Sequence, residues 1–506
     1  MNLRGAGYTN PVIPGFHPDP SVCRVGDAYY LVASSFTYFP GVPIFHSRNL
    51  VDWTQIGNVL DRPSQLDLTA THGWASFGVY APTLRFHDGR FWMISTNVTT
   101  VGATTFLVIA DDPAGPWSDP VTVDIAGIDP DLAWDDEGAC WLHFSGLGGI
   151  ARCRIDDATG TVIGEPERTW SGTGLQYPEA PHLFGREGTW YLLIAEGGTE
   201  RGHVVSVARG PSPVGPWESC PANPILSHRS TDRPIQNTGH ADFVDAADGS
   251  WWMVLLGARH RGGTPGFHVL GRETFLAPVE WRDGWPMVGP LTPEMPGPLP
   301  GPREPEVRIH RDDFEGPELH ARWLAVRRSP HTFASLKARH GYLTLSGSKS
   351  TLDSPEPSFI GLRQQHHQCR VRARVEAATG AEAGLAVLMD EAAHYEVSVR
   401  GDRVIARARI GPLRAVVDDV PRPNGSVVLR VETRSGGAGP DIVVLGFEDD
   451  GGDFQVLAEL DGRYLSTEVA GGFLGRVIGM YAVEGDAVFD WFDYEALDAE
   501  SVPQGG

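Results

Sequence analysis

The clearest pattern of hydrophobic and polar positions in this chain is a short unit that occurs five times. In each copy a Gly or Asp is followed, after one or two residues, by a pair of bulky residues that opens an apolar strand. The second bulky residues of the copies are Tyr30, Trp92, Trp141, Tyr191 and Trp252, at intervals of 62, 49, 50 and 61 residues. Ordinary strands that contain aromatic residues would not be spaced so regularly. Turn, aromatic pair and strand at this period are typical of β-propeller blades, so the sequence predicts a five-bladed propeller.

A change of pattern marks the end of this repeat. Residues 286–306 are rich in proline, show no periodicity and are typical of a semi-rigid connector. Beyond them, short runs such as residues 369–375 alternate between apolar and polar positions, which predicts an antiparallel β-sandwich. No segment longer than about ten residues has helical periodicity. We therefore predict an all-β protein with a propeller at 1–290, a linker at 291–307 and a sandwich at 308–506.

Length and charge narrow the classes of partner. The chain has 506 residues, enough for two or three domains, and a formal net charge of −23. This charge repels phosphate backbones and anionic membranes, and no basic stretch overrides it. We expect no nucleic-acid and no membrane partner, whereas a neutral ligand such as a sugar is compatible.

Cysteine usage and the first residues of the chain bear on its compartment. The five cysteines are scattered without metal-ligand spacing, and their odd number argues against a disulfide framework. The first twelve residues lack the apolar stretch of a secretory signal, and no run of 18 apolar residues occurs. We expect reduced core thiols, no metal site built on cysteine and a cytoplasmic protein.

Three acidic residues are framed by prolines. Asp19 lies between Pro18 and Pro20, where the prolines restrict the backbone and bias Asp19 toward extended geometry. Taken alone, that string is more typical of a Pro-Asp turn than of a catalytic position. However, Asp129 also precedes a proline, and Glu179 follows one. These acids belong to different predicted blades, and a closed propeller could bring all three to its axis.

Converging carboxyl groups are typical of enzymes that hydrolyse glycosidic bonds. One group must be a protonated acid and another an ionised base. A third carboxylate close to the acid disfavours its ionisation and keeps it protonated near neutral pH. The fold alone does not establish this activity, because propellers also serve as lectins and scaffolds.

Several motifs in one order resemble family 43 of the glycoside hydrolases, which comprises five-bladed-propeller β-xylosidases and α-L-arabinofuranosidases. The resemblance covers nearly the whole chain, including a concanavalin-like C-terminal sandwich. The motifs lie at residues 10–12 and 15–21, 39–44, 195–199, 238–241, 270–274 and 284–286. The resemblance implies that Asp19 is the general base, Glu179 the general acid and Asp129 the group that raises the pKa of the acid. It also implies inversion of the anomeric configuration.

The same resemblance implies residues that bind the sugar. Phe36 would form an apolar wall, Arg272 would bind sugar hydroxyls, and Thr199 would line the pocket. A core phenylalanine and a surface salt bridge are the alternatives for the first two. His240 resembles a histidine near the axis that, in some members, ligates a central calcium. No cofactor is required by this interpretation, and a structural Ca²⁺ near the axis is an alternative; we assign His240 to the sugar site without a metal.

Two departures from the family pattern bear on specificity. Tyr80 stands where many relatives have tryptophan, at a position that the resemblance assigns to sugar binding. Ala180 follows Glu179 where glycine is more usual. In the sandwich, residues 471–475 resemble a loop that closes the pocket in relatives, which would place Phe473 at the leaving-group subsite.

Together these features predict an exo-acting, inverting hydrolase. It would release terminal β-D-xylose or α-L-arabinofuranose from small oligosaccharides. The alternative from another class is a non-catalytic sugar-binding propeller. Oligomeric state is open, and a homo-oligomer is compatible with the sequence.

Overall fold

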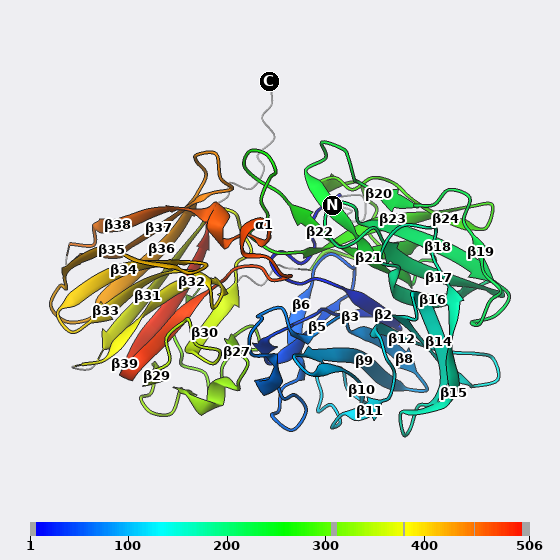
Figure 1. Cartoon of the computed structure of the whole chain (residues 1–506), viewed down its shortest axis with the longest axis horizontal. Coiled ribbons are helices and arrows are strands. Elements are labelled where there is room, and N and C mark those ends of the chain that lie inside the picture. The colour runs from blue at the N-terminus through cyan, green and yellow to red at the C-terminus, as the bar shows by residue number, and fades with distance from the viewer. Residues whose placement is uncertain (1–6, 305–310, 378–379, 450, 498–506) are drawn as a thin grey trace. The chain divides into compact units, whose positions relative to one another are not determined.

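The structure is a computed structural model that describes residues 7–304, 311–377, 380–449 and 451–497 (Figure 1). The described residues form two compact units. The first comprises those of Met1–Arg259 and Arg272–Glu306, and the second those of His260–Gly271 and Val307–Gly506. Residues 305–310, which include the expected end of the linker and the expected start of the sandwich at 308, lie outside the described residues.

Five antiparallel sheets, blue to green in Figure 1, make up the first unit and confirm the predicted five blades. The first blade contains β2 (Ser21–Val25), β3 (Ala28–Val32), β5 (Gly41–Ser47) and β6 (Thr54–Leu60). The second contains β7 (Gly78–Val79), β8 (Thr83–His87), β9 (Arg90–Thr99), β10 (Gly102–Ala110) and β11 (Val121–Val123). The third contains β12 (Ile128–Trp134), β13 (Cys140–Gly146), β14 (Gly149–Asp156) and β15 (Thr161–Trp170).

The last two blades follow the same order. The fourth contains β16 (Glu179–Arg186), β17 (Thr189–Glu196), β18 (Val204–Gly210), β19 (Glu218–Ser219) and β20 (Leu226–Ser227). The fifth contains β21 (Ile235–Asp245), β22 (Trp251–Arg259), β23 (Glu273–Arg282) and β24 (Trp285–Val288). The five aromatic register marks lie in β3, β9, β13, β17 and β22, the strand after the innermost one in every blade.

The innermost strands of neighbouring blades contact one another in a closed ring of β2, β8, β12, β16 and β21. Clusters of buried aliphatic and aromatic side chains fill the space between successive blades. Burial of apolar area at about 25 cal/mol per Å² stabilises this packing. The ring therefore brings residues that are far apart in sequence to one axis.

The two ends of the propeller chain close this ring. β1 (Tyr8–Thr9) pairs with β25 (Glu294–Met295). Asn10 exchanges two hydrogen bonds with the backbone of Leu276, at 2.9 and 3.0 Å. Leu291 and Leu299 are buried. The described part of the proline-rich segment thus belongs to the propeller, because its apolar residues and its short strand pack on the first unit.

The second unit is a sandwich of antiparallel strands, as predicted (Figure 1). Its longest strand, β39 (Val477–Ala496), pairs with β32 (Glu382–Asp390) and β30 (Ser358–Arg363) through its first residues, and with β31 (Cys369–Ala377) through its last. β39 is therefore shared by both sheets.

Further strands extend each sheet from this shared strand. One sheet continues through β33 (Ala393–Arg400), β34 (Arg403–Ile410) and β35 (Leu413–Pro421), and the other through β36 (Val427–Arg434), β37 (Ile442–Glu448) and β38 (Phe454–Asp461). The remaining short strands of this unit are β26 (Arg311–Asp312), β27 (Leu324–Val326), β28 (Ala334–Ser335) and β29 (Leu343–Ser348), whereas β4 (Tyr38–Phe39) belongs to the first unit. The single α-helix among the described residues is α1 (Thr467–Ala470).

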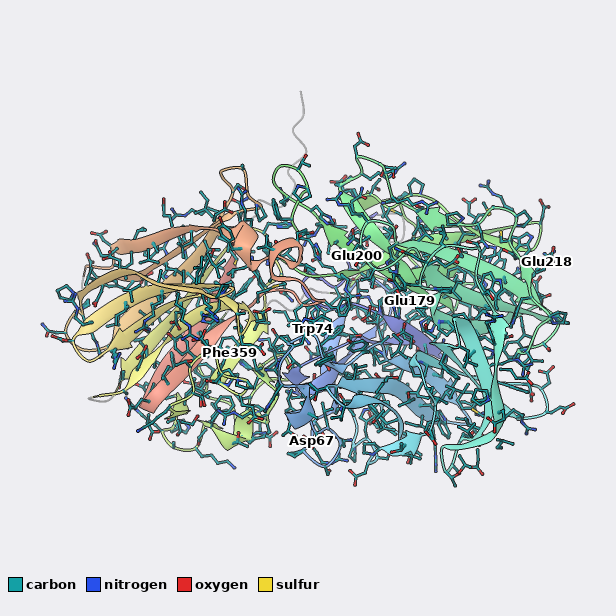
Figure 2. The ribbon with its side chains drawn as sticks, in the orientation of Figure 1. Asp67, Trp74, Glu179, Glu200, Glu218 and Phe359 are labelled. Atoms are coloured by element: carbon teal, nitrogen blue, oxygen red, sulfur yellow. The ribbon has the colours of Figure 1, made fainter. Side chains whose placement is uncertain are left out.

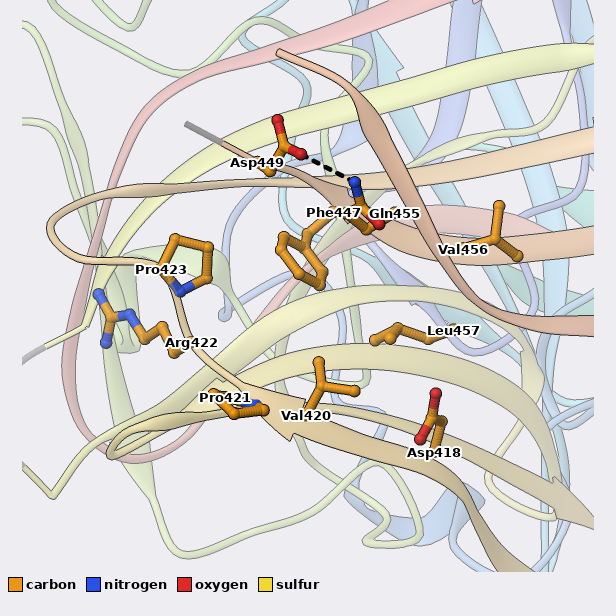
Figure 3. Close-up of a pocket in the computed structure, with 10 residues that line it drawn as sticks. All are labelled: Asp418, Val420, Pro421, Arg422, Pro423, Phe447, Asp449, Gln455, Val456 and Leu457. Carbon is orange, nitrogen blue, oxygen red and sulfur yellow. Dashed lines mark hydrogen bonds between the residues drawn. The ribbon is translucent and has the colours of Figure 1, made fainter. Parts of the chain in front are cut away.

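A pocket of about 480 Å³ lies where the two terminal strands of the sandwich, β35 and β38, approach each other (Figure 3). Its lining mixes apolar side chains such as Val420 and Phe447 with the carboxylates Asp418 and Asp449. None of the predicted catalytic or sugar-binding residues lines it.

Two sequence-based expectations about the chain's surroundings can be compared with this structure. All five cysteines are buried and free, as expected for reduced core thiols. Within the described ranges, no helix is both long enough and apolar enough to cross a bilayer.

Candidate active site

The three predicted catalytic acids lie at the entrance to their innermost strands. Asp19 comes two residues before the start of β2, and Asp129 is the second residue of β12. Glu179, which is labelled in Figure 2, is the first residue of β16. In β12 and β16 the pairing register shifts directly after these acids, as at a β-bulge. Such an irregularity re-aims a side chain at a strand end.

The backbone at these positions corrects one expectation. We expected extended geometry at Asp19, but its φ is +56°, and φ is +53° at both Asp129 and Ala180. All three residues precede a proline. The left-handed conformation is strained for residues other than glycine, and the closed ring with its hydrogen bonds holds it in place. His240 in β21 has the same feature, with a φ of +47°.

Asp19 is buried and receives polar contacts on both carboxylate oxygens. The Ser34 hydroxyl donates to Oδ2 at 2.5 Å, and Arg272 Nη1 donates to Oδ1 at 3.0 Å. His240 Nδ1 lies 3.5 Å from Oδ1. Burial raises the pKa of Asp19, but Arg272, His240 and Ser34 together outweigh it and hold the pKa below its usual value.

Glu179 and Asp129 are shifted in the opposite direction. Burial raises the pKa of Glu179 to about 8, with further contributions from the charges of Asp129 and Asp19. Burial likewise raises the pKa of Asp129, and the charge of Asp19 adds to this, although the Ala180 amide donates to Asp129 Oδ2 at 3.2 Å. The mutual effects of these charges show that the three carboxyl groups share one site.

Four of the predicted sugar-binding residues surround this site. The rings of Phe36 and Tyr80 lie 5.1 Å apart, and the Arg272 guanidinium lies 5.7 Å from the centre of the Phe36 ring. Arg272 Nη1 also donates to the Thr199 hydroxyl at 3.0 Å. Arg272 is only 7% exposed, so its ion pair with Asp19 is a buried one rather than the surface salt bridge considered as an alternative.

Phe473 is the one predicted site residue in the second unit, where it lies in the turn between α1 and β39. Its assignment to the leaving-group subsite stays a prediction.

A second group of polar residues follows the acids along the same strands, and the sequence analysis missed it. Ser21, Asp131, His182 and Asp242 come two residues after Asp19, Asp129, Ala180 and His240, respectively. They surround Arg85 of β8. Its guanidinium lies 2.8 Å from Asp131 Oδ1, 2.7 Å from Asp242 Oδ2 and 3.0 Å from His182 Nδ1.

We call Asp19, Asp129, Glu179 and His240 the acid layer, and Arg85 with its four neighbours the arginine layer. In the arginine layer, burial lowers the pKa of His182 to about 3, so this imidazole is neutral at neutral pH. Burial raises the pKa of Asp131 to about 7 despite Arg85, whereas for Asp242 the contacts with Arg85 outweigh burial and lower the pKa. The polar residues that follow Asp19 and Asp129 by two positions and Glu179 by three are the signal that could have revealed this layer.

The fold and the acid layer define a class of protein, a glycosidase, in which carboxyl groups of unequal pKa converge at the axis of a propeller. Comparisons with known proteins give the family. Residues 8–286 match the description "Glycosyl hydrolases family 43", and residues 311–495 match "Beta xylosidase C-terminal Concanavalin A-like domain". The chain belongs to family 43 of the glycosyl hydrolases.

Relatives along the full chain agree with this assignment. The chain is 39% identical to a non-reducing end α-L-arabinofuranosidase of Bacteroides ovatus, over 98% of this chain and 96% of that one. It is 36% identical to a xylosidase/arabinosidase of Butyrivibrio fibrisolvens, over 97% and 99% of the two chains. The crystal structure of a xylan β-1,4-xylosidase from Bacillus halodurans superposes with a TM-score of 0.89 at 31% identity, covering 96% of this chain and all of that one.

Proposed function

We propose that this glycosidase is exo-acting and inverting, and that it releases terminal β-D-xylose, α-L-arabinofuranose or both from short oligosaccharides. The named activities of its relatives, one of them a non-reducing end arabinofuranosidase and another a xylosidase/arabinosidase, support both sugars. The cytoplasmic location and the homo-oligomer considered from the sequence stay predictions.

The opposite pKa shifts of two carboxyl groups in one site carry the assignment of roles. Because the pKa of Asp19 is lowered and that of Glu179 is raised to about 8, Asp19 is ionised and Glu179 protonated at neutral pH. These are the states required of a general base and a general acid.

The reaction then proceeds in a single displacement. Asp19 takes a proton from a water molecule as the water oxygen attacks the anomeric carbon from the face opposite the leaving group. Glu179 gives its proton to the leaving glycosidic oxygen as the bond to the anomeric carbon breaks. Asp19 then releases its proton to solvent and Glu179 takes one up from solvent, which restores the ionised base and the protonated acid.

Arg272 and Ser34 are positioning residues for the base in this scheme. Each donates a hydrogen bond to a different Asp19 oxygen, which fixes the plane of the carboxylate and favours its charged form. Asp129 favours the protonated form of Glu179 through its negative charge. The aromatic pair of Phe36 and Tyr80 supplies the apolar wall against which a sugar ring packs.

A calcium ion at the axis fits these residues poorly. Calcium takes six to eight oxygen ligands. In the arginine layer, however, the carboxylates of Asp131 and Asp242 are already paired with the Arg85 guanidinium, at 2.8 and 2.7 Å. We propose that Arg85 supplies the positive charge there, so added Ca²⁺ should not raise the activity of chelator-treated enzyme.

The direct test of the roles compares two leaving groups in the Glu179→Gln variant. The activities on 4-nitrophenyl β-D-xylopyranoside and 4-nitrophenyl α-L-arabinofuranoside establish the preferred sugar. The loss in kcat/KM should then be about 10²–10⁴-fold on the matching disaccharide and clearly smaller on the 4-nitrophenyl glycoside, because 4-nitrophenolate departs without protonation.

The matched control is Glu187→Gln, at the turn that follows β16, which should behave like the parent enzyme on both substrates. An equal loss on both substrates would contradict the role of Glu179 as general acid. Release of the product with retained anomeric configuration, followed by NMR at early times, would contradict inversion.

A further inference from the structure

A hairpin in the second unit brings two histidines together outside the catalytic site. The segment His260–Gly271 leaves the end of β22 and turns back, with Arg261 and Phe267 exchanging backbone hydrogen bonds at 2.9 Å in both directions. His260 and His268 flank this bridge, and their ring centres lie 5.0 Å apart. The side chains of both are largely buried, at 8% and 7% exposure.

A carboxylate from a distant part of the chain faces both rings. Glu468 is the second residue of α1, and its Oε1 lies 2.6 Å from His268 Nδ1 and 3.2 Å from His260 Nε2. Its other oxygen, Oε2, accepts a hydrogen bond from the His268 backbone amide at 2.9 Å. The amide therefore orients the carboxylate so that one oxygen is directed at both imidazoles.

We propose that His260, His268 and Glu468 bind a divalent first-row transition metal, with Zn²⁺ as the best match. Two imidazole nitrogens and one carboxylate oxygen are a ligand set that suits Zn²⁺, with water in the fourth position. One ligand atom from each residue lies within 4.8 Å of the other two. Tetrahedral coordination with bonds of about 2.0–2.1 Å separates ligand atoms by about 3.3 Å, which small side-chain rotations reach from here.

The surroundings of these residues support a metal of this kind. The His268 amide acts as the outer hydrogen bond that commonly orients a ligating group. Ca²⁺ and Mg²⁺ need mainly oxygen ligands, so they match this set poorly.

The metal would fasten two segments of the second unit that are 200 residues apart in sequence. Next to the site, the Arg476 amide donates to the Val269 carbonyl at 3.0 Å, and Gly475 lies against the backbone of Leu270 so closely that a Cβ atom there would be 2.5 Å from its carbonyl oxygen. Coordination of one metal ion by His260, His268 and Glu468 would join the hairpin to α1 and add a second link between these segments beside this contact. Because the metal ion would bind the folded state and not the unfolded one, its binding would stabilise the protein.

The experiment uses the full chain after treatment with a chelator and return to metal-free buffer. Titration calorimetry and elemental analysis after gel filtration should give one Zn²⁺ per chain, and saturating Zn²⁺ should raise the unfolding temperature by about 5 °C. Co²⁺ in place of Zn²⁺ should give visible absorption bands of a four-coordinate nitrogen and oxygen site. This spectrum needs no variant and tests the geometry directly.

Variants locate the ion. His268→Gln and Glu468→Gln should each weaken Zn²⁺ binding by at least about tenfold to hundredfold, whereas His340→Gln, which alters an exposed histidine of the same unit, should not change it. The absence of stoichiometric Zn²⁺ in the parent chain would overturn the proposal and leave Glu468 as a hydrogen-bond acceptor for the two rings. Zn²⁺ binding that survives in Glu468→Gln would also overturn it.

Discussion

The acid layer and the arginine layer are built from the same strands but balance their charges differently. In the arginine layer a buried guanidinium lies between Asp131 and Asp242, within 2.8 Å of each, and the histidine beside it is neutral. In the acid layer three carboxyl groups share the charge of one arginine, Arg272, which donates to Asp19 Oδ1 at 3.0 Å. Burial raises the pKa of Glu179 and Asp129, whereas at Asp19 the contacts with Arg272, His240 and Ser34 outweigh burial and lower the pKa.

This difference shows how one propeller axis serves two purposes. Paired charges in the arginine layer hold the innermost strands of the blades together. In the acid layer, burial together with the charges of Asp129 and Asp19 keeps a proton on Glu179 at neutral pH, where an ordinary glutamate would have lost it. Removing a charge should therefore affect activity in one layer and stability in the other.

The largest expected effect is the loss of activity in Asp19→Asn. Without a base to take the proton from water, kcat should fall by about 10²–10⁴-fold on both aryl glycosides and disaccharides. The free energy of unfolding in urea should fall by less than in Arg85→Met, because the amide of Asn retains an oxygen that accepts from Arg272, although the charge of this buried ion pair is lost. Near-parental kcat in a correctly folded variant would refute the assignment of the base.

Arg85→Met should mainly affect the stability of the fold. Removing the guanidinium leaves Asp131 and Asp242 buried without their cation, which should lower the free energy of unfolding by about 3–5 kcal/mol. A second substitution, Asp242→Asn, should restore part of that loss, and urea titrations of the single and double variants measure the coupling. Independent, additive effects would mean that the layer does not act as an ion-pair network.

Asp129→Asn should move the alkaline limb of the pH profile. Removing this charge lowers the pKa of Glu179 from about 8, so activity should be lost at a lower pH, by up to about one unit. The measurement is kcat/KM as a function of pH for the variant and its parent. As a control, Glu187→Gln should not change the pH at which kcat/KM is lost on the alkaline side. If Asp129→Asn does not change this pH either, Asp129 does not raise the pKa of Glu179.

The smallest effect should come from the strained backbone beside the acid. Ala180 has a φ of +53°, a conformation that costs alanine about 1–2 kcal/mol and glycine almost nothing. Glycine loses more conformational entropy on folding, so the net effect of Ala180→Gly should be a free energy of unfolding that is higher by about 0.5–1 kcal/mol. Ala241→Gly, directly after His240, should instead destabilise, because Ala241 is as buried as Ala180 but lies outside the left-handed region. The same sign for both variants would contradict this account of the strain.

The sequence was sufficient to predict the blades because their signal is local. A turn residue, an aromatic pair and a strand recur at a regular spacing, and the positions of Tyr30, Trp92 and Trp141 in successive blades confirm it. The proline beside each acid likewise pointed to Asp19, Asp129 and Glu179. Residues from separate blades could be grouped because a closed propeller has a single axis.

Other features depend on contacts that local patterns do not contain. The strained φ at Asp19 opposes the usual effect of a following proline, and only the closed ring enforces it. Arg85 was missed because nothing around it in sequence marks it as central; its importance comes from Asp131 and Asp242, which are 46 and 157 residues away. The grouping of residues 260–271 with the second unit is equally non-local.

The central claim is that Asp19 is ionised while Glu179 remains protonated at neutral pH, and the pH dependence of kcat/KM on an unactivated disaccharide tests it most directly. The account predicts a plateau that begins in the acidic range, below the usual aspartate pKa of about 3.9, and ends in the loss of one proton near pH 8. An alkaline limb near the ordinary glutamate pKa of about 4.3 would contradict it.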